Sequence, residues 1–229
     1  MKAEFWHERW EKSQIGFHNQ KVNALLSEYW PGLGIEKGAP VFVPLCGKSL
    51  DMHWLKDREH PVVGIELSPL AVHDFFREAE ISPLQARSGS LERFSSQGID
   101  LYCGDLFELG SSELARTRAC YDRGSLVALP PELRVRYAKH LARVLPTPMT
   151  ILMITIEYDQ SKMKGPPHSV SQREVEKLFG EDFEIERLWM GDWVEASPMF
   201  QARGLDTRRD LIFRLDRNSD DTNRKGARR

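Results

Sequence analysis

A glycine loop and a carboxylate in an apolar run are the residues of this sequence that most clearly carry chemistry. Glu66 lies inside the run Val62–Leu67, where a carboxylate needs a buried partner or a ligand. It follows Gly47 by about 20 residues, the offset at which dinucleotide-binding folds place the acid that binds both ribose hydroxyls. The alternative is a glutamate at a strand end paired with a Lys or Arg side chain. The two residues together favour a ribose-containing ligand.

The loop around Gly47 reads Pro44-Leu-Cys-Gly-Lys-Ser49 and resembles a phosphate-binding loop at first sight. The spacing excludes that motif, because GxxxxGK[ST] needs a glycine at the position of Phe42, inside the predicted strand. The loop is not GxGxxG either. A ribose ligand without a pyrophosphate loop points to S-adenosylmethionine more than to NAD, and Gly47 allows the backbone to approach the compact amino-acid end of that cofactor.

Two further positions follow predicted strands. Asp105 and Leu106 come after the third strand, where a polar and an apolar side chain can flank an adenine, although an ordinary turn explains them nearly as well. Arg123 follows Asp122 at the end of the fourth strand. Its guanidinium can bind the cofactor carboxylate or a polar face of the substrate. The alternative is a surface pair between Asp122 and Arg123.

Large aromatic side chains precede every predicted strand. Trp6, Trp10 and Phe17 lie on helix-like sequence that also holds His18. Aromatic faces attract a sulfonium cation by about 0.5 to 2 kcal/mol, so this segment is interpreted as a lid over the cofactor. Packing in the core is the alternative.

The composition of the chain and the spacing of its residues argue against several other classes of function. A net charge of -2 disfavours a nucleic-acid binder, and no apolar run approaches the roughly 18 residues of a membrane span. The 3 cysteines lack CxxC spacing, which fits a reduced compartment and a cytoplasmic protein. The histidines form no ligand-spaced cluster, so no metal is expected. No GxSxG motif is present, so a nucleophile elbow is not expected.

The elements that must position these residues alternate between strand and helix. This order predicts an α/β fold, a doubly wound and mostly parallel sheet with an antiparallel edge strand. The domain is expected to cover residues 1–215, followed by a disordered polar tail at 216–229. The predicted strands are 41–45, 62–67, 99–103, 119–122, 150–156, 183–188 and 210–215, and the predicted helices are 50–56, 69–80, 131–144 and 171–179.

Several motifs together resemble the thiopurine S-methyltransferase family. They occur in the family's order and spacing from about Trp6 to Leu215. The motifs are Trp10 with Phe17-His18, Pro44-Leu-Cys-Gly-Lys-Ser49, Gly64-Ile-Glu-Leu-Ser68, Leu101-Tyr-Cys103, Asp122-Arg-Gly-Ser-Leu-Val-Ala128 and Gly165-Pro-Pro-His168. The resemblance implies a Rossmann-like, class I S-adenosylmethionine-dependent methyltransferase fold.

The resemblance also implies roles for particular residues. The family's cofactor positions fall on Trp10, Leu45, Glu66, Asp105, Leu106 and Arg123, and its substrate positions on Phe17, Arg123, Pro166 and Pro167. Gly104-Asp105 and Tyr121 depart from animal relatives, which carry Cys-Ser and Trp there. The short N-terminal extension is similar to the bacterial branch, which implies selenium and tellurium acceptors beside thiopurines.

The expected reaction is an in-line transfer of a methyl group to a soft, acidic thiol or selenol, which needs little general-base help. Positioning then dominates, and Arg123 stabilises the thiolate-like acceptor. The expected partner is a small-molecule substrate, with no nucleic acid and no membrane, and the expected state is a monomer. Two alternatives remain, a P-loop-like NTPase and a nucleotide-binding module without turnover.

Overall fold

The structure, a computed structural model, describes residues 3–218, and these divide into two units with the boundary between Tyr121 and Asp122. Each unit is described by itself. The boundary falls inside one strand, β6 (Ala119–Arg123), so the expectation of one domain up to residue 215 stays a prediction.

Parallel strands form the centre of the first unit, as the alternation of strands and helices predicts. Within this unit the strands lie in the order β3-β4-β5-β2-β1-β6. β1 (Val41–Val43) pairs in parallel with β2 (Val62–Glu66) on one side and with β6 on the other. β2 pairs in parallel with β5 (Ile99–Cys103). The carboxyl ends of these strands therefore lie at one edge of the sheet.

An antiparallel hairpin that the sequence did not predict extends this sheet. β3 (Leu84–Ser88) pairs with β4 (Leu91–Ser96), which pairs antiparallel with β5. Four of the five residues of β3 are exposed, so this edge strand lacks the apolar alternation by which a strand is identified in a sequence.

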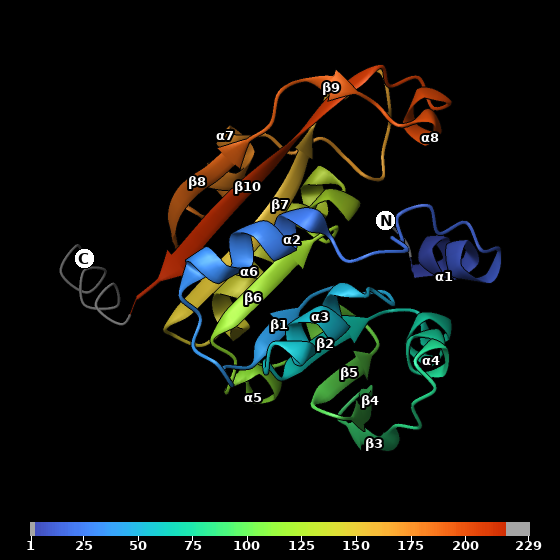
Figure 1. Ribbon diagram of the computed structural model, residues 1–229, viewed down its shortest axis with the longest axis vertical. Helices are drawn as coiled ribbons and strands as arrows, with labels where there is room; N and C mark the ends of the chain where they lie inside the picture. The colour runs from blue at the N-terminus through green and yellow to red at the C-terminus, as the bar shows by residue number, and fades with distance from the viewer. Residues whose placement is uncertain (1–2, 219–229) are drawn as a thin grey trace. The chain divides into compact units, whose positions relative to one another are not determined.

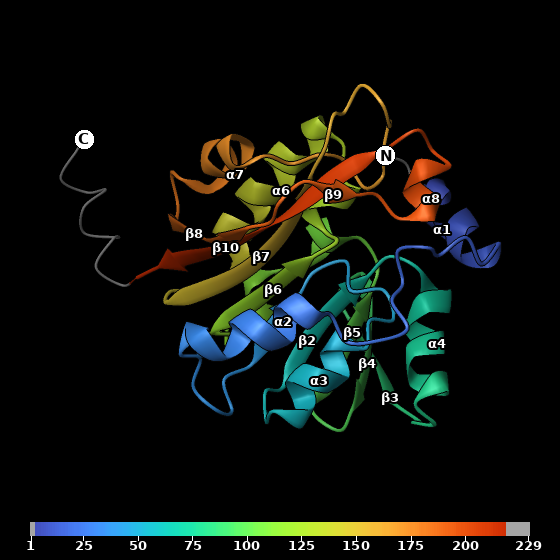
Figure 2. The same ribbon diagram turned by 45° about the horizontal axis from the view of Figure 1, so that its top comes forward.

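One helix of the first unit, α4, begins where local signals predict. α4 starts at Pro69, and Ser68 accepts the hydrogen bond of the Ala71 N–H group as its N-cap. α3 and α4 contact β2, and α4 also contacts β5 and α1 (Figures 1 and 2). The helical segments are α1 (Ala3–Glu11), α2 (Ala24–Tyr29), η1 (Trp30–Leu33), α3 (Asp51–Asp57), α4 (Pro69–Glu78), η2 (Leu106–Glu108) and α5 (Ser111–Leu114).

The second unit contains the antiparallel strands that follow β6. The central pair is β7 (Met149–Glu157) with β10 (Thr207–Arg217). β10 also pairs antiparallel with β8 (Glu184–Met190) and with β9 (Val194–Glu195). The antiparallel part is thus larger than the single edge strand expected. The helical segments are η3 (Leu126–Ala128), α6 (Pro131–Val144), α7 (Gln172–Phe179) and α8 (Pro198–Gln201).

The expected end of the folded chain at residue 215 is two residues too early. β10 continues through Asp216 and Arg217, which pair with Thr150 and Met149. Thr150 Oγ1 donates to Asp216 Oδ1 (2.6 Å). Polar side chains can end a buried strand when each has a partner, which composition alone does not show. The rest of the expected tail, residues 219–229, lies outside the described residues.

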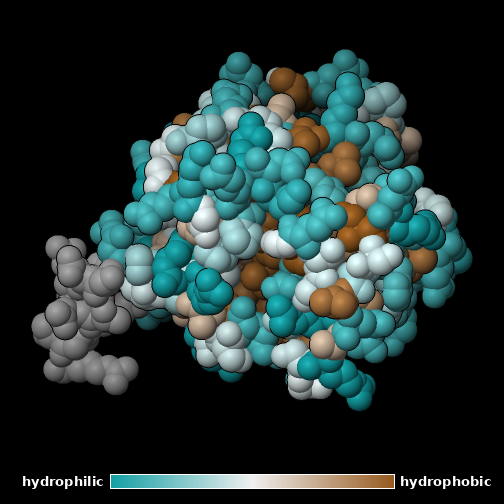
Figure 3. Space-filling view, turned by 60° about the horizontal axis from the view of Figure 1, so that its bottom comes forward, coloured by the Kyte–Doolittle hydropathy of each residue, from teal (hydrophilic) through white to brown (hydrophobic). Residues whose placement is uncertain are grey.

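Exposed apolar side chains occur in both units. On the face seen in Figure 3, brown apolar areas are separated by hydrophilic surface. Within residues 3–218, no helix has the length and hydropathy that crossing a bilayer requires. The exposed large apolar residues are Phe17, Leu70, Leu84, Val135, Trp189, Met190, Trp193, Val194 and Met199.

Candidate functional site

The turn after β1 has an unusual backbone. Leu45 and Gly47 both have positive φ, of 43° and 53°. The Cys46 N–H group between them donates to the carbonyl of Ile65 (2.9 Å), which holds the turn against β2. A left-handed conformation is costly at a residue with a branched side chain such as Leu45, and such strain is concentrated at functional sites. The glycine at position 47 predicts a left-handed backbone, whereas the residue type at Leu45 does not.

Glu66, the last residue of β2, holds this turn from the other side. Its Oε2 accepts from the Gly47 N–H group (2.9 Å) and its Oε1 from the Ser68 N–H group (2.8 Å). The side chain is only 7% exposed, and burial raises the pKa of this carboxyl although the backbone hydrogen bonds from Ser68 and Gly47 oppose the shift. Within residues 3–218 its partners are therefore backbone amides and not the Lys or Arg side chain of the alternative interpretation. Glu66 and Gly47, which the sequence analysis combined by their spacing, are thus in direct contact, and their binding of a ribose stays a prediction.

Lys48, the residue that suggested a phosphate-binding loop, is engaged in ion pairs. Its Nζ lies 2.6 Å from Glu78 Oε1 and 3.5 Å from Asp74 Oδ2, both on α4. The Lys48 side chain is 9% exposed. It therefore fastens the turn to α4, and its charge is already compensated by carboxylates. This arrangement argues further against phosphate binding by the loop.

The aromatic segment contacts the same turn. Trp10 on α1 is 4% exposed, and its ring lies so close to Gly47 that a Cβ there would be 3.3 Å from Cζ2. Phe17 packs edge-on against Trp10 and Trp6, with centroids 5.6 and 5.7 Å apart, and is 41% exposed. His7 Nε2 lies 3.3 Å from the carbonyl oxygen of Leu67. The helix α1 thus packs on the turn that holds Glu66, and its action as a lid stays a prediction.

Asp51, which was not predicted from the sequence to have a role, connects three segments of the first unit. It is 2% exposed at the start of α3. Its Oδ1 accepts from the Asn23 N–H group (2.8 Å) and its Oδ2 from Tyr121 Oη (3.0 Å). It thereby ties the chain that follows the aromatic segment to α3 and β6. An acid in a first helical turn is common, so no local signal reveals these distant partners.

The loop after β5 brings Asp105 and Leu106 to the same edge. The Gly104 N–H group donates to the Glu66 carbonyl oxygen (2.9 Å), so this loop begins beside the end of β2. Asp105 is exposed and its Oδ1 accepts from the Phe107 N–H group (3.0 Å), which starts η2. Leu106 is 4% exposed. The structure thus gathers Leu45, Glu66 and Asp105 at the carboxyl ends of three parallel strands, where such sheets bind ligands.

The remaining predicted residues belong to the second unit. Asp122 is fully buried, and its carboxylate accepts from Tyr137 Oη (2.8 Å) and the Leu126 N–H group (3.3 Å). Burial raises the pKa of this carboxyl. The alternative of a surface pair between Asp122 and Arg123 is wrong, because Asp122 is used inside the unit. Arg123, the last residue of β6, is half-buried.

Pro166 and Pro167 lie in the loop between β7 and α7, and both carbonyls are held. Tyr158 Oη donates to the Pro167 carbonyl oxygen (2.7 Å) and Arg203 Nη1 to that of Pro166 (2.9 Å). His168 follows, and burial, together with the charge of Arg134, lowers its pKa. Among residues 3–218, no three His, Cys, Asp or Glu side chains gather where they could hold a metal ion.

Comparison with known proteins identifies sequence relatives along the whole body of the chain. The family described as thiopurine S-methyltransferase matches residues 1–218. A thiopurine S-methyltransferase of Nitrosospira multiformis is 47% identical over 94% of this chain and 98% of its own length. The thiopurine S-methyltransferase of Marinobacter nauticus is 45% identical over 90% of this chain and 94% of its own length.

Solved structures support the fold. A methyltransferase of Burkholderia thailandensis that acts on 1,6-didemethyltoxoflavin, solved with S-adenosylhomocysteine, superimposes with a TM-score of 0.60 at 15% identity, over 95% of this chain and 87% of that one. A methyltransferase of Anabaena variabilis also has a TM-score of 0.60, at 13% identity, over 94% and 95% of the two chains. The predicted class I methyltransferase fold is confirmed. With relatives at 41 to 47% identity over nearly their full length, the chain is an enzyme that belongs to the thiopurine S-methyltransferase family.

Proposed function

We propose that the protein transfers the methyl group of S-adenosylmethionine to the sulfur of thiopurines or of related aromatic and heterocyclic thiols, with selenium or tellurium species as further acceptors. One observation carries the cofactor part of the proposal. The buried Glu66 carboxylate lies at the carboxyl end of β2 and orders the left-handed turn at Gly47 through a hydrogen bond. A ribose diol is the ligand that an acid at this position binds in related folds.

The residues around Glu66 fit the other parts of such a cofactor. The Trp10 ring packs so close to Gly47 that a Cβ there would lie 3.3 Å from it, and the bare glycine backbone beside the ring suits the compact amino-acid end. The aromatic face of Trp10 suits a sulfonium. Asp105 and Leu106, one exposed and one buried, suit an adenine edge and face. The proposed cofactor-binding residues are Trp10, Leu45, Glu66, Asp105, Leu106 and Arg123.

The proposed acceptor chemistry depends on positioning more than on proton transfer. The cofactor, when bound, supplies a methyl carbon activated by its bond to a sulfonium sulfur. Aromatic thiols are acidic, so the sulfur can attack as a thiolate without a side-chain base. Arg123 is proposed to hold this thiolate by charge-assisted hydrogen bonds. Phe17, Pro166 and Pro167 are proposed to contact the aromatic ring and exclude water.

The experiment that tests this proposal combines binding with turnover. Calorimetric titration with S-adenosylmethionine, ATP and NAD is expected to give binding with S-adenosylmethionine alone. Methylation of 6-mercaptopurine, followed by product chromatography, is expected to need that cofactor. ATP binding that depends on Mg²⁺ would favour the NTPase alternative. Cofactor binding with no turnover of any thiol or selenol would favour the nucleotide-binding module.

The remaining partner assignments are part of the same proposal. The mildly acidic charge and the 3 cysteines without CxxC spacing support a cytoplasmic protein that binds neither nucleic acid nor membrane. A monomer is proposed, and light scattering at the assay concentration tests it.

A further inference from the structure

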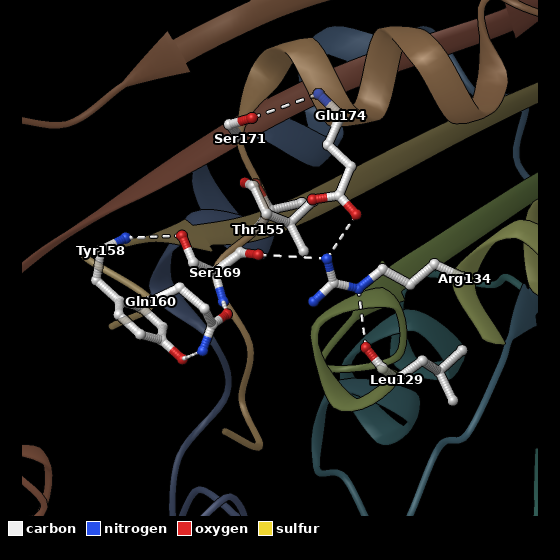
Figure 4. A network of polar contacts seen from close by, with 9 residues as sticks. Leu129, Arg134, Thr155, Tyr158, Gln160, Ser169, Ser171 and Glu174 are labelled. Carbon is white, nitrogen blue, oxygen red and sulfur yellow. Dashed lines mark hydrogen bonds and ion pairs between the residues drawn. The ribbon is translucent and has the colours of Figure 1, made fainter. Parts of the chain in front are cut away.

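A buried arginine in the second unit is not used by the chemistry proposed above. Arg134 lies on α6 and is 2% exposed. Its Nε donates to the Leu129 carbonyl oxygen (2.8 Å), and its Nη1 lies 2.6 Å from Glu174 Oε1 on α7 (Figure 4). Its Nη2 is buried and has no hydrogen-bond partner in the described part of the chain. A buried guanidinium with an unused donor costs stability, which calls for another reason for its presence.

The same guanidinium contacts the loop that carries the two prolines. Nη1 also donates to the Ser169 carbonyl oxygen (3.3 Å), two residues after Pro167. Figure 4 shows Arg134 reaching from α6 to Ser169 and Glu174 together. Ser171, the N-cap of α7, accepts from the Glu174 N–H group. Arg134 therefore fixes the end of the loop and the first turn of the next helix as one piece.

The other side of the loop is held from the end of β7. The Tyr158 N–H group donates to Ser169 Oγ (3.0 Å), and the Ser169 N–H group donates to Gln160 Oε1 (2.9 Å). Thr155 Oγ1 donates to the Val170 carbonyl oxygen (3.1 Å). Ser169 thus forms hydrogen bonds through its amide, its hydroxyl and its carbonyl group. The hydrogen bond to the Ser169 carbonyl oxygen is the one that comes from α6, through Arg134.

We propose that Arg134 is a positioning residue for methyl transfer, which places Pro166 and Pro167 against the acceptor by holding Ser169 and Glu174. The inference rests on the proposed function, because the two prolines are proposed and not demonstrated substrate contacts. The planar fork carries the role: Nε binds the Leu129 carbonyl before α6, and Nη1 binds the loop at Ser169 and α7 at Glu174. A lysine at this position would keep the charge and lose that geometry.

The test compares Arg134→Lys with a matched control, Arg217→Lys. Arg217 also holds backbone carbonyls in this unit, at Ala142 (2.7 Å), Leu145 and Pro146 (3.0 Å). It pairs with Met149 at the start of the 9-residue strand β7, roughly 25 Å from the other end of that strand, which leads into the proline loop. Both variants lose an arginine fork, so both are expected to have a lowered Tm.

Only Arg134→Lys is expected to change acceptor binding. Its KM for 6-mercaptopurine should rise about tenfold or more while the Kd for S-adenosylmethionine stays within about twofold, the pattern of a lost acceptor contact. Arg217→Lys should keep both constants. A KM within about twofold of wild type in Arg134→Lys, or an equal rise in Arg217→Lys, overturns the proposal.

Two further measurements keep the test decisive. If Arg134→Lys does not fold, Glu174→Gln replaces it: the amide oxygen still accepts a hydrogen bond, and a smaller rise in KM is expected. If the wild-type protein methylates no thiol, the proposed function has failed. Hydrogen exchange then tests separately whether Arg134 holds the proline loop in place. The amides of Gly165 and of residues 168–171 should then exchange faster in Arg134→Lys than in Arg217→Lys, and equal exchange overturns the positioning role.

Discussion

The charge of the Glu66 carboxylate can be removed without changing the size of the side chain, by substitution with glutamine. The carboxylate accepts hydrogen bonds from the Gly47 and Ser68 N–H groups, and it is proposed to accept from the ribose. Glu66→Gln removes the charge and leaves one backbone N–H group facing an NH₂. We expect S-adenosylmethionine binding to weaken by at least about 1.5 kcal/mol, the low end for a charge-assisted bond. Calorimetry measures this, with the exposed Glu36→Gln as control.

The same carboxyl predicts how binding depends on pH. Burial raises the pKa of Glu66, so on acidification it protonates at a higher pH than an ordinary glutamate. The protonated carboxyl is a weaker acceptor, and affinity should therefore fall as the pH decreases through the raised pKa. Titrations from pH 8 downwards should show this fall in wild type and not in Glu66→Gln. Parallel curves for the two proteins would remove Glu66 from the cofactor site.

Arg123 is the residue on which the acceptor step is proposed to depend. The burial of Asp122 and its bonds to Tyr137 and Leu126 fix the backbone next to it. Arg123→Lys should lower kcat/KM moderately, and Arg123→Ala by on the order of 10², as for loss of an oxyanion donor. Cofactor affinity should fall less. Steady-state methylation beside cofactor titration distinguishes the roles: equal losses would make Arg123 a cofactor anchor, and near-normal turnover in Arg123→Ala would remove it from the reaction.

At the scale of elements, the contact between α1 and the turn after β1 predicts the cost of a side chain at Gly47. Alanine there must adopt φ of 53° and place its Cβ 3.3 Å from the Trp10 ring. Gly38→Ala is the matched control, since Gly38 has φ of 79° and no atom within 4 Å of its Cβ position.

Both glycine variants should lose about 1 to 2 kcal/mol from the left-handed backbone alone. Gly47→Ala should lose more, because the Trp10 ring must move, and its Kd for S-adenosylmethionine should rise. Urea unfolding followed by fluorescence gives the free energies. Equal losses in the two variants would mean that α1 yields freely and does not act as a lid.

At the scale of the whole chain, the end of β10 decides which residues can be removed. A chain ending at Asn218 keeps Arg217 and its bonds to three carbonyl oxygens, whereas a chain ending at Leu215 loses them. We expect the shorter chain to unfold at a lower Tm, by several degrees if a few kcal/mol are lost. Removal of residues 219–229 is expected to leave the Tm and methyl transfer unaltered. Calorimetric scans of both truncations test the boundary, and identical scans would show that Arg217 contributes nothing.

Local rules were enough to predict many elements from the sequence. The helix Pro131–Val144 was predicted with its observed bounds, and Ser68 caps α4 as its hydroxyl and the following proline indicate. These features depend on neighbours a few residues apart. The link between Gly47 and Glu66 was also predictable, since the carboxyl ends of adjacent parallel strands meet at one edge.

Partners far apart in the sequence were decided only by the tertiary structure. Asp51 bonds to Tyr121, Lys48 pairs with α4, and Arg134 holds Ser169 and Glu174. In the sequence each of these is an ordinary charged residue on or near a helix. A buried charge needs partners wherever the fold places them, and no local pattern encodes partners that lie 26 to 70 residues away. The sequence by itself therefore determined the strands, the helices and the edge at which cofactor chemistry is expected, while the packing of distant segments decided which side chains hold that edge and the proline loop in place.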